Sequence, residues 1–147
     1  MPRWVTRLHA RVYRRSGGRV LGHMGGQPVL LLQTTGRRSG LPRTTPVPYL
    51  ADSDTFVVVA SNAGAARPPA WYLNLRADPH ARIGVGARSI DVRAQEASGQ
   101  ARADLWQRLT AANRYLERAA RKAGRDLPLM TLVPPTPTAP RPATDRS

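Results

Sequence analysis

Six short β-type runs, separated by Gly, Pro, Asp and Ser, constrain the fold of this chain more than any other feature. Runs of roughly four to eight apolar and β-branched residues with such boundaries are typical of strands joined by turns. Consecutive runs of this kind predict antiparallel pairing, and closing the sheet into a barrel removes its exposed edges. We therefore expect a mainly β, α+β domain with a closed or nearly closed barrel. The runs are residues 29–33, 44–50, 55–60, 81–85, 89–94 and 127–133.

Three further segments predict helices beside the barrel. The first follows two prolines, which suit the first turn of a helix. The second begins at Ser98, a favourable N-cap residue, and continues with amphipathic spacing. The third ends at Gly124, a residue that commonly terminates helices. These segments are residues 70–76, 98–112 and 116–123.

The N-terminal segment has a different pattern. Residues 3–15 carry an apolar stripe of Trp4, Leu8 and Val12 beside a stripe of arginines, which predicts an amphipathic helix with a basic face. Such a helix either covers the core or lies on an anionic bilayer, and both interpretations stay open. We expect three parts in the chain: an amphipathic helix and Gly-rich connection (1–26), the barrel domain (27–133) and a disordered Pro-rich tail (134–147).

The formal net charge of +14 narrows the choice of partners. Lys122 is the only lysine, so 22 of the 23 basic residues are arginine. Arginine pairs with phosphate or carboxylate through two parallel hydrogen bonds. A nucleic acid, an anionic membrane surface and an acidic ligand would all match this charge. The few aromatic residues are not interleaved with the basic ones, which argues against a single-strand nucleic-acid platform. We expect no nucleic-acid partner.

Several classes of site are disfavoured by what the sequence lacks. There is no cysteine, which excludes disulfides, thiolate nucleophiles and iron–sulfur clusters. His9, His23 and His80 lie far apart without carboxylates at ligand spacing, so we expect no metal. No apolar run approaches the roughly 18 residues needed for a membrane span, and arginines stand where a signal peptide would be apolar. We expect a cytoplasmic protein, with residues 3–15 as a candidate contact to the inner face of the membrane.

The most polar segment with a candidate function is TTGRRSGLPR, residues 34–43, between two predicted strands. Its glycines let backbone amides turn inward, and its hydroxyls and three arginines add hydrogen-bond donors. These features predict a phosphate cradle, although an ordinary basic hairpin loop would have a similar composition. The spacing and lysine of a P-loop are missing, and no GxGxxG follows a strand. A classical nucleotide-binding fold is therefore not expected.

Two other segments have features of a ring-binding site. In ASNAG, residues 60–64, small side chains would let a flat ring approach the main chain, although a plain turn uses the same residues. In PAWYLNL, residues 69–75, Trp71 and Leu75 are spaced for one helix face and are expected in the core. Tyr72 and Asn74 have polar tips that could face a pocket.

Taken in order, TTGRRSGLPRTTPVPYL, VVVASNAGA and PAWYLNLRADP resemble the deazaflavin-dependent nitroreductase family, also described as a quinone reductase group. The similarity extends over residues 28–133. It implies a split β-barrel of the FMN-binding type and coenzyme F420, a 5-deazaflavin, as cofactor. It also implies three groups of cofactor-binding residues. They are Arg37, Arg38 and Ser39 for the phosphate and acidic tail; Arg43, Thr44, Thr45, Pro46, Val47, Pro48, Val59, Ala60, Ser61 and Asn62 for the ring; and Ala70, Trp71, Tyr72, Leu73 and Asn74 to close the site.

The chain departs from the family pattern at two positions. Some family members have a lysine in place of Asn62, which would add a positive contact to the coenzyme. Nitro-reducing members have several tyrosines after the long helix, where this chain has Leu116. Tyr115 is adjacent, but one helical position rotates a side chain by roughly 100°. Coenzyme binding is therefore better supported than any particular acceptor.

The resemblance implies an oxidoreductase that transfers a hydride from reduced F420 to a planar electrophile: a quinone, an enone or a nitroaromatic. The cofactor carries the chemistry, so the protein has to position two planar systems and needs no catalytic dyad. Tyr72, Ser61, Tyr115 or water could supply the proton. A redox-inactive carrier of the deazaflavin, of FMN or of heme is the main alternative, because one fold hosts many functions. We expect a monomer or homodimer acting on a small-molecule acceptor.

Overall fold

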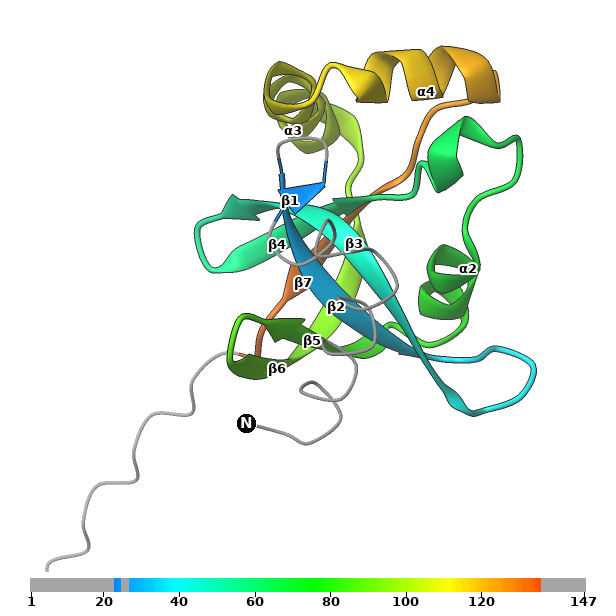
Figure 1. The fold of residues 1–147 in the computed structure, drawn as a ribbon, viewed down its shortest axis with the longest axis vertical. Coiled ribbons are helices and arrows are strands. Elements are labelled where there is room, and N and C mark those ends of the chain that lie inside the picture. The colour runs from blue at the N-terminus through cyan, green and yellow to red at the C-terminus, as the bar shows by residue number, and fades with distance from the viewer. Residues whose placement is uncertain (1–22, 25–26, 136–147) are drawn as a thin grey trace, which may run out of the picture.

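The computed structural model describes residues 23–24 and 27–135, and all six predicted strands and the three predicted barrel-flanking helices are confirmed there (Figure 1). The predicted helix at 3–15 and most of the predicted tail lie outside the described residues. Sequence reasoning missed the short strand β1 and the 3-10 turn η1. The elements are β1 His23–Met24, β2 Gln27–Thr35, β3 Pro42–Asp52, β4 Thr55–Val59, η1 Asn62–Gly64, α2 Ala70–Ala77, β5 His80–Val85, β6 Arg88–Glu96, α3 Gly99–Ala112, α4 Tyr115–Ala123 and β7 Leu129–Val133.

The strands form a closed antiparallel barrel. Strand order is β1-β2-β3-β4-β7-β6-β5, and an additional pairing of β2 with β5 closes the circle. The closing contact is short, and its central pair joins Leu32 to Ile83. Because β2 pairs with β3 along most of its length, the closed barrel continues into a β2–β3 hairpin that extends beyond it (Figure 1). In the part of the chain that the structure describes, no helix is long and apolar enough to cross a membrane.

The barrel is open beside the first half of β3. This strand pairs with β2 from Pro42 to Pro48, but with β4 only from Tyr49 onward. Three prolines, Pro42, Pro46 and Pro48, lie in the half that β4 leaves uncovered. A proline fits a continuous ladder only where its missing N–H would face away from the partner strand. The β4-side edge of β3 therefore has no partner strand over this half, and the candidate site described below lies beside it.

Two apolar clusters hold the elements together. The first fills the barrel and includes Leu32, Val58 and Ile83. The second lies between the outside of the sheet and the helices α3 and α4, and it includes Val57 and Leu109. Neighbouring strand residues point to opposite faces, so Val57 and Val58 serve different clusters and β4 is buried on both sides. The helices α3 and α4 therefore lie against one end of the barrel, away from the hairpin tip (Figure 1).

Leu32→Ala should destabilise the fold by about 2 to 5 kcal/mol, because it leaves a cavity among side chains that cannot fully collapse. Leu32 is 0% exposed in the barrel core. Leu41→Ala is the matched control, since Leu41 is 57% exposed and should change the stability by less than about 0.5 kcal/mol. Denaturant unfolding followed by circular dichroism measures both. Equal losses in the two variants would show that the barrel is not packed around Leu32.

Candidate functional site

A pocket of about 430 Å³ lies between the β2–β3 hairpin and α2, and we call it the arginine pocket. Nine of the predicted cofactor-binding residues line it, together with Thr34 and Gly36. The nine are Arg37, Arg38, Ser39, Arg43, Thr44, Thr45, Ala70, Trp71 and Asn74. Members of all three predicted groups therefore meet in one place, and Arg43, Thr44 and Thr45, which were predicted to contact the ring, lie beside the predicted phosphate-binding loop.

The hairpin loop is tightly turned where it forms this pocket. The amide of Gly36 donates to the carbonyl of Leu41 at 2.8 Å, and the amide of Gly40 donates to the carbonyl of Gly36 at 2.8 Å. Gly40 has a φ of 70°, a conformation that favours glycine. A Cβ at Gly36 would lie 2.6 Å from the Ser39 hydroxyl oxygen, so any larger residue would force the Ser39 side chain to move. The turn leaves a compact concave surface with arginine side chains around it.

Asn74 joins α2 to the loop. Its side chain is buried, and its Nδ2 donates to the Thr34 hydroxyl at 3.1 Å. Its Oδ1 accepts a hydrogen bond from the Arg37 amide at 3.1 Å. Arg37 Nη1 also approaches this oxygen at 3.5 Å. Asn74 therefore positions the loop, and its amide group is already occupied by protein partners.

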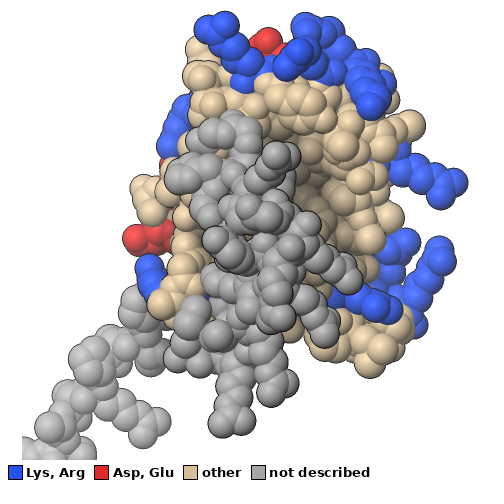
Figure 2. Space-filling view, viewed as in Figure 1, with Lys and Arg blue, Asp and Glu red and all other residues tan. Residues whose placement is uncertain are grey.

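The polar side chains around the arginine pocket are mostly hydrogen-bond donors. Three guanidinium groups and four hydroxyls line it, and no carboxylate does. The three ion pairs formed within the described residues are elsewhere in the fold. Figure 2 shows basic side chains gathered over α4 and beside the hairpin on the face that it displays. This donor set fits a phosphate or carboxylate group and would repel a cation.

A second pocket, of about 330 Å³, lies between the end of β4, the 3-10 turn and the two helices, and we call it the apolar pocket. Its predicted members are Pro48, Val59, Ser61 and Tyr115. Leu116 is buried in its wall, whereas Tyr115 is 44% exposed. Ala63, from the predicted ring-binding segment 60–64, also lines it, whereas sequence reasoning missed Gln27, Leu109 and Asn113.

Gln27 and Asn113 show why part of this lining was missed. Asn113 Nδ2 donates to Gln27 Oε1 at 3.1 Å, and both side chains are buried although they are 86 residues apart. Asn113 Oδ1 also accepts from the Tyr115 amide at 3.1 Å, which fixes the start of α4. An asparagine between two helical patterns is a signal for such a capping role, but no local pattern indicates its partner.

The uncovered half of β3 runs from one pocket to the other. Val47 is buried in the barrel, so alternate residues such as Thr44 and Pro48 face outward. Thr44 lines the arginine pocket and Pro48 lines the apolar pocket. Four residues of extended chain span about 13 Å. The two pockets thus lie against the same strand, at positions four residues apart.

Six of the predicted cofactor-binding residues line neither pocket. Val47 and Ala60 are packed inside the barrel, and Leu73 packs against the same cluster. Asn62 Nδ2 donates to the Arg67 carbonyl at 3.0 Å. The remaining two are Pro46 and Tyr72. Pro46 lies on the uncovered half of β3, between the residues that line the two pockets.

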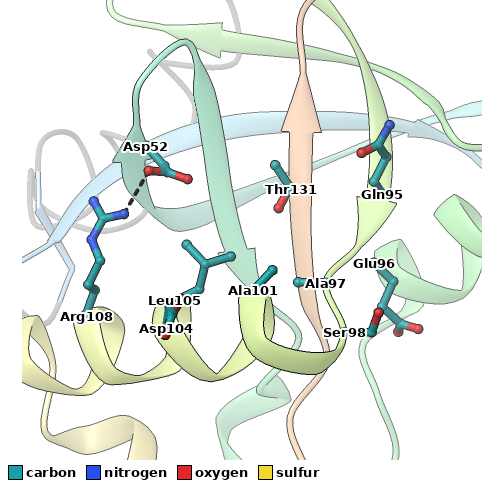
Figure 3. Close-up of a pocket in the computed structure, with 10 residues that line it drawn as sticks. All are labelled: Asp52, Gln95, Glu96, Ala97, Ser98, Ala101, Asp104, Leu105, Arg108 and Thr131. Atoms are coloured by element: carbon teal, nitrogen blue, oxygen red, sulfur yellow. Dashed lines mark hydrogen bonds and ion pairs between the residues drawn. The ribbon is translucent and has the colours of Figure 1, made fainter.

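Tyr72 binds a residue of a third pocket through its hydroxyl. Its ring is buried in the barrel core, and its hydroxyl donates to the Glu96 carboxylate. Glu96 lines a pocket beside α3 that also contains Asp52, Asp104 and Arg108 (Figure 3). Arg108 Nη1 binds the Asp52 carboxylate there at 2.8 Å. The Tyr72 hydroxyl is therefore directed away from the two pockets that contain the other predicted site residues.

Comparison with known proteins identifies the family of this chain. Residues 4–134 match the model of the F420H(2)-dependent quinone reductase family. The chain belongs to this family. An F420H(2)-dependent quinone reductase of Mycobacterium tuberculosis is 40% identical over 135 residues, which cover 88% of this chain and 89% of that protein. The sequence-based prediction of an F420H2-dependent reductase is thereby confirmed, and membership implies use of coenzyme F420.

Solved structures support the same assignment. A structure described as an F420-H2 dependent reductase has a TM-score of 0.66 and 28% identity, covering 75% of this chain and 97% of that one. A second, described as a domain-swapped dimer, has a TM-score of 0.67 and 27% identity, covering 88% and 96%. The predicted split barrel is therefore confirmed for this chain. Within the described residues, no group of three or more His, Cys, Asp or Glu side chains could hold a metal ion.

The Tyr72 hydroxyl should ionise above the ordinary tyrosine pKa of 10.0, because burial and then the hydrogen bond to Glu96 raise its pKa. Stability that depends on the neutral phenol is present below pH 10 and is lost as the pH rises through the raised pKa. Absorbance titration of the wild type against Tyr72→Phe isolates this group. Ionisation of the Tyr72 hydroxyl at a pH below 10 would contradict its placement.

Proposed function

We propose that this chain binds coenzyme F420 along the uncovered half of β3 and uses its reduced form to reduce a quinone. One observation carries the proposal: the arginine pocket and the apolar pocket both lie along the uncovered half of a single strand, β3. F420 combines a phosphate and acidic tail with a flat apolar ring system, so each pocket has a chemically matching part. Family membership supports the same cofactor.

In this proposal the arginine pocket holds the acidic part of the coenzyme. Arg37, Arg38 and Arg43 supply the positive charge, and the Ser39 hydroxyl adds a short donor. The contacts of Asn74 with Thr34 and Arg37 keep the loop in shape before the ligand arrives. A preformed site loses less conformational entropy on binding. These residues are therefore assigned to affinity and not to the chemical step.

The apolar pocket is proposed to hold the reacting centres. Bound reduced F420 supplies a hydride from C5 of its deazaflavin ring. Pro48, Val59 and Leu116 provide flat apolar contact that aligns planar groups and keeps water away. Ser61 and Tyr115 are the two hydroxyl groups in its lining. We assign proton delivery to one of them, because the third predicted donor, Tyr72, is engaged with Glu96.

The decisive experiment is direct binding of oxidised F420 to the purified protein, followed by absorbance or fluorescence. Arg37→Ala and Arg38→Ala should each weaken this binding by about 1.5 to 3 kcal/mol, the usual loss for a charge-assisted hydrogen bond. Turnover at saturating coenzyme should change little, since neither side chain lines the apolar pocket.

Arg88→Ala provides a control with the same change in charge. Arg88 is exposed at the start of β6 and belongs to neither pocket, so its loss should leave the affinity for F420 nearly unchanged. Normal affinity in the double variant Arg37→Ala/Arg38→Ala would refute the assignment of the arginine pocket.

The acceptor preference follows from the lining of the apolar pocket. We expect faster reduction of quinones and enones than of bulky bicyclic nitro compounds, because Leu116 offers apolar contact but no hydroxyl. Rates with reduced F420 across a panel of these acceptors measure the preference. Strong nitroreduction without quinone reduction would show that Leu116 does not determine the acceptor in this way.

A further inference from the structure

The loop that brings Ser61 to the apolar pocket has an unfavourable backbone. We call residues 60–67 the pocket loop. Asn62, Ala63 and Gly64 follow one another with positive φ angles of 45°, 54° and 80°. Glycine and asparagine tolerate this region, but an alanine there is strained. A run of this kind persists only where surrounding contacts determine it.

Arg125 makes these contacts with one guanidinium group. Its Nε donates to the Ala66 carbonyl at 3.0 Å, and its Nη2 donates to the carbonyls of Ala65 at 3.2 Å and Arg67 at 3.3 Å. Nη1 and Nη2 also approach the Ala60 carbonyl, at 3.5 and 3.4 Å. Both ends of the pocket loop are therefore bound to the same planar cation.

The end of α4 places Arg125 against the loop. Gly124 terminates this helix with a φ of 65°, and the chain then turns back toward β7. Gly64 packs against the same helix end, where an added Cβ would lie 3.0 Å from the Lys122 side chain. The amide of Ala60 donates to the Pro128 carbonyl at 2.9 Å. The pocket loop is thus fixed to the segment between α4 and β7.

Arginine is specifically suited to this position. None of the three ion pairs among the described residues involves Arg125, so carbonyl dipoles surround its charge in place of a carboxylate. Its five N–H groups diverge in a fixed plane and can reach separate carbonyls, whereas a lysine ammonium is a single point of donation. In a trans peptide the C=O and N–H point in opposite directions. Holding the Ala60 carbonyl therefore turns the Ser61 amide away from Arg125.

We propose that Arg125 is a positioning residue of the apolar pocket: its guanidinium holds the pocket loop in the strained shape that presents Ser61 and Ala63 to the coenzyme ring and acceptor. Arg125 acts through the loop and does not line either pocket. The part of this inference that concerns turnover rests on the proposed function. The part that concerns the shape of the loop is independent of it.

Arg125→Gln and Arg125→Lys test the proposal, with Arg121→Gln as the control at an exposed position on α4. The amides of Gly64 and Ala65 donate to carbonyls within the loop, so their hydrogen exchange reports on its opening. Their exchange should be about ten times faster or more in Arg125→Gln, less accelerated in Arg125→Lys and unchanged in the control. Exchange in the barrel strands should stay at the wild-type rate in all three.

Kinetics provide the second readout. With saturating coenzyme and quinone, kcat of Arg125→Gln should fall by about tenfold or more, because small displacements of a reacting group are costly. The Kd for oxidised F420 should rise by less than about threefold, since the coenzyme tail is bound elsewhere. Arg125→Lys should recover part of kcat. A general loss of folding would instead accelerate exchange throughout the barrel and lower the active fraction in both assays.

Unchanged exchange at Gly64 and Ala65 in Arg125→Gln would overturn the proposal, as would a normal kcat despite an opened loop. If Arg125→Gln does not fold, Arg125→Lys decides on the same two criteria. If the wild-type protein does not reduce quinones with reduced F420, the proposed function fails, while the exchange measurement still decides whether Arg125 holds the loop.

Discussion

Strand β2 pairs with β3 on one side and with β5 on the other, and the rest of the structure depends on this shared strand. Its contact with β5 is limited to Leu31–Gln33, which closes the barrel around Leu32. Its contact with β3 is longer and continues into the hairpin. Since β3 follows β2 away from the barrel, β4 can cover only its second half. The same pairing that closes the core therefore also creates the open edge on which both pockets lie.

Buried amide side chains link the barrel to the candidate site. Asn74 ties α2 to the arginine loop, and Asn113 ties the junction of α3 and α4 to β2. Each amide satisfies donor and acceptor groups at once, and an unsatisfied buried polar group would be costly. Three acidic side chains, Asp52, Glu96 and Asp104, lie together in a separate pocket, and none lines the arginine pocket. The arrangement keeps negative charge out of the arginine pocket in a chain whose formal net charge is +14.

Local patterns predicted the strands, the helices and the basic loop, because alternation, turn residues and helix boundaries are properties of neighbouring residues. The direction in which an individual side chain points depends on partners that are distant in the sequence, so local patterns could not predict it. Tyr72 and Asn74 both have polar tips on one short helix, yet Glu96 binds the first and Thr34 the second. Strand β1 has only two residues and no pattern of its own. The sequence could not predict the contacts of Arg125, because its four partners are main-chain carbonyls and every residue has one.

The three prolines of the uncovered half of β3 have a consequence for the behaviour of the protein in a crowded solution. An exposed strand edge is normally a template on which another chain can add a strand, and this leads to aggregation. Pro42, Pro46 and Pro48 offer no amide hydrogen, so of the alternating positions 42, 44, 46 and 48 only Thr44 keeps the donor that an incoming strand would need. The opening can thus stay accessible to a small molecule while offering a poor template for another strand. Ligand access and colloidal stability, which usually conflict at a sheet edge, are reconciled here by three prolines.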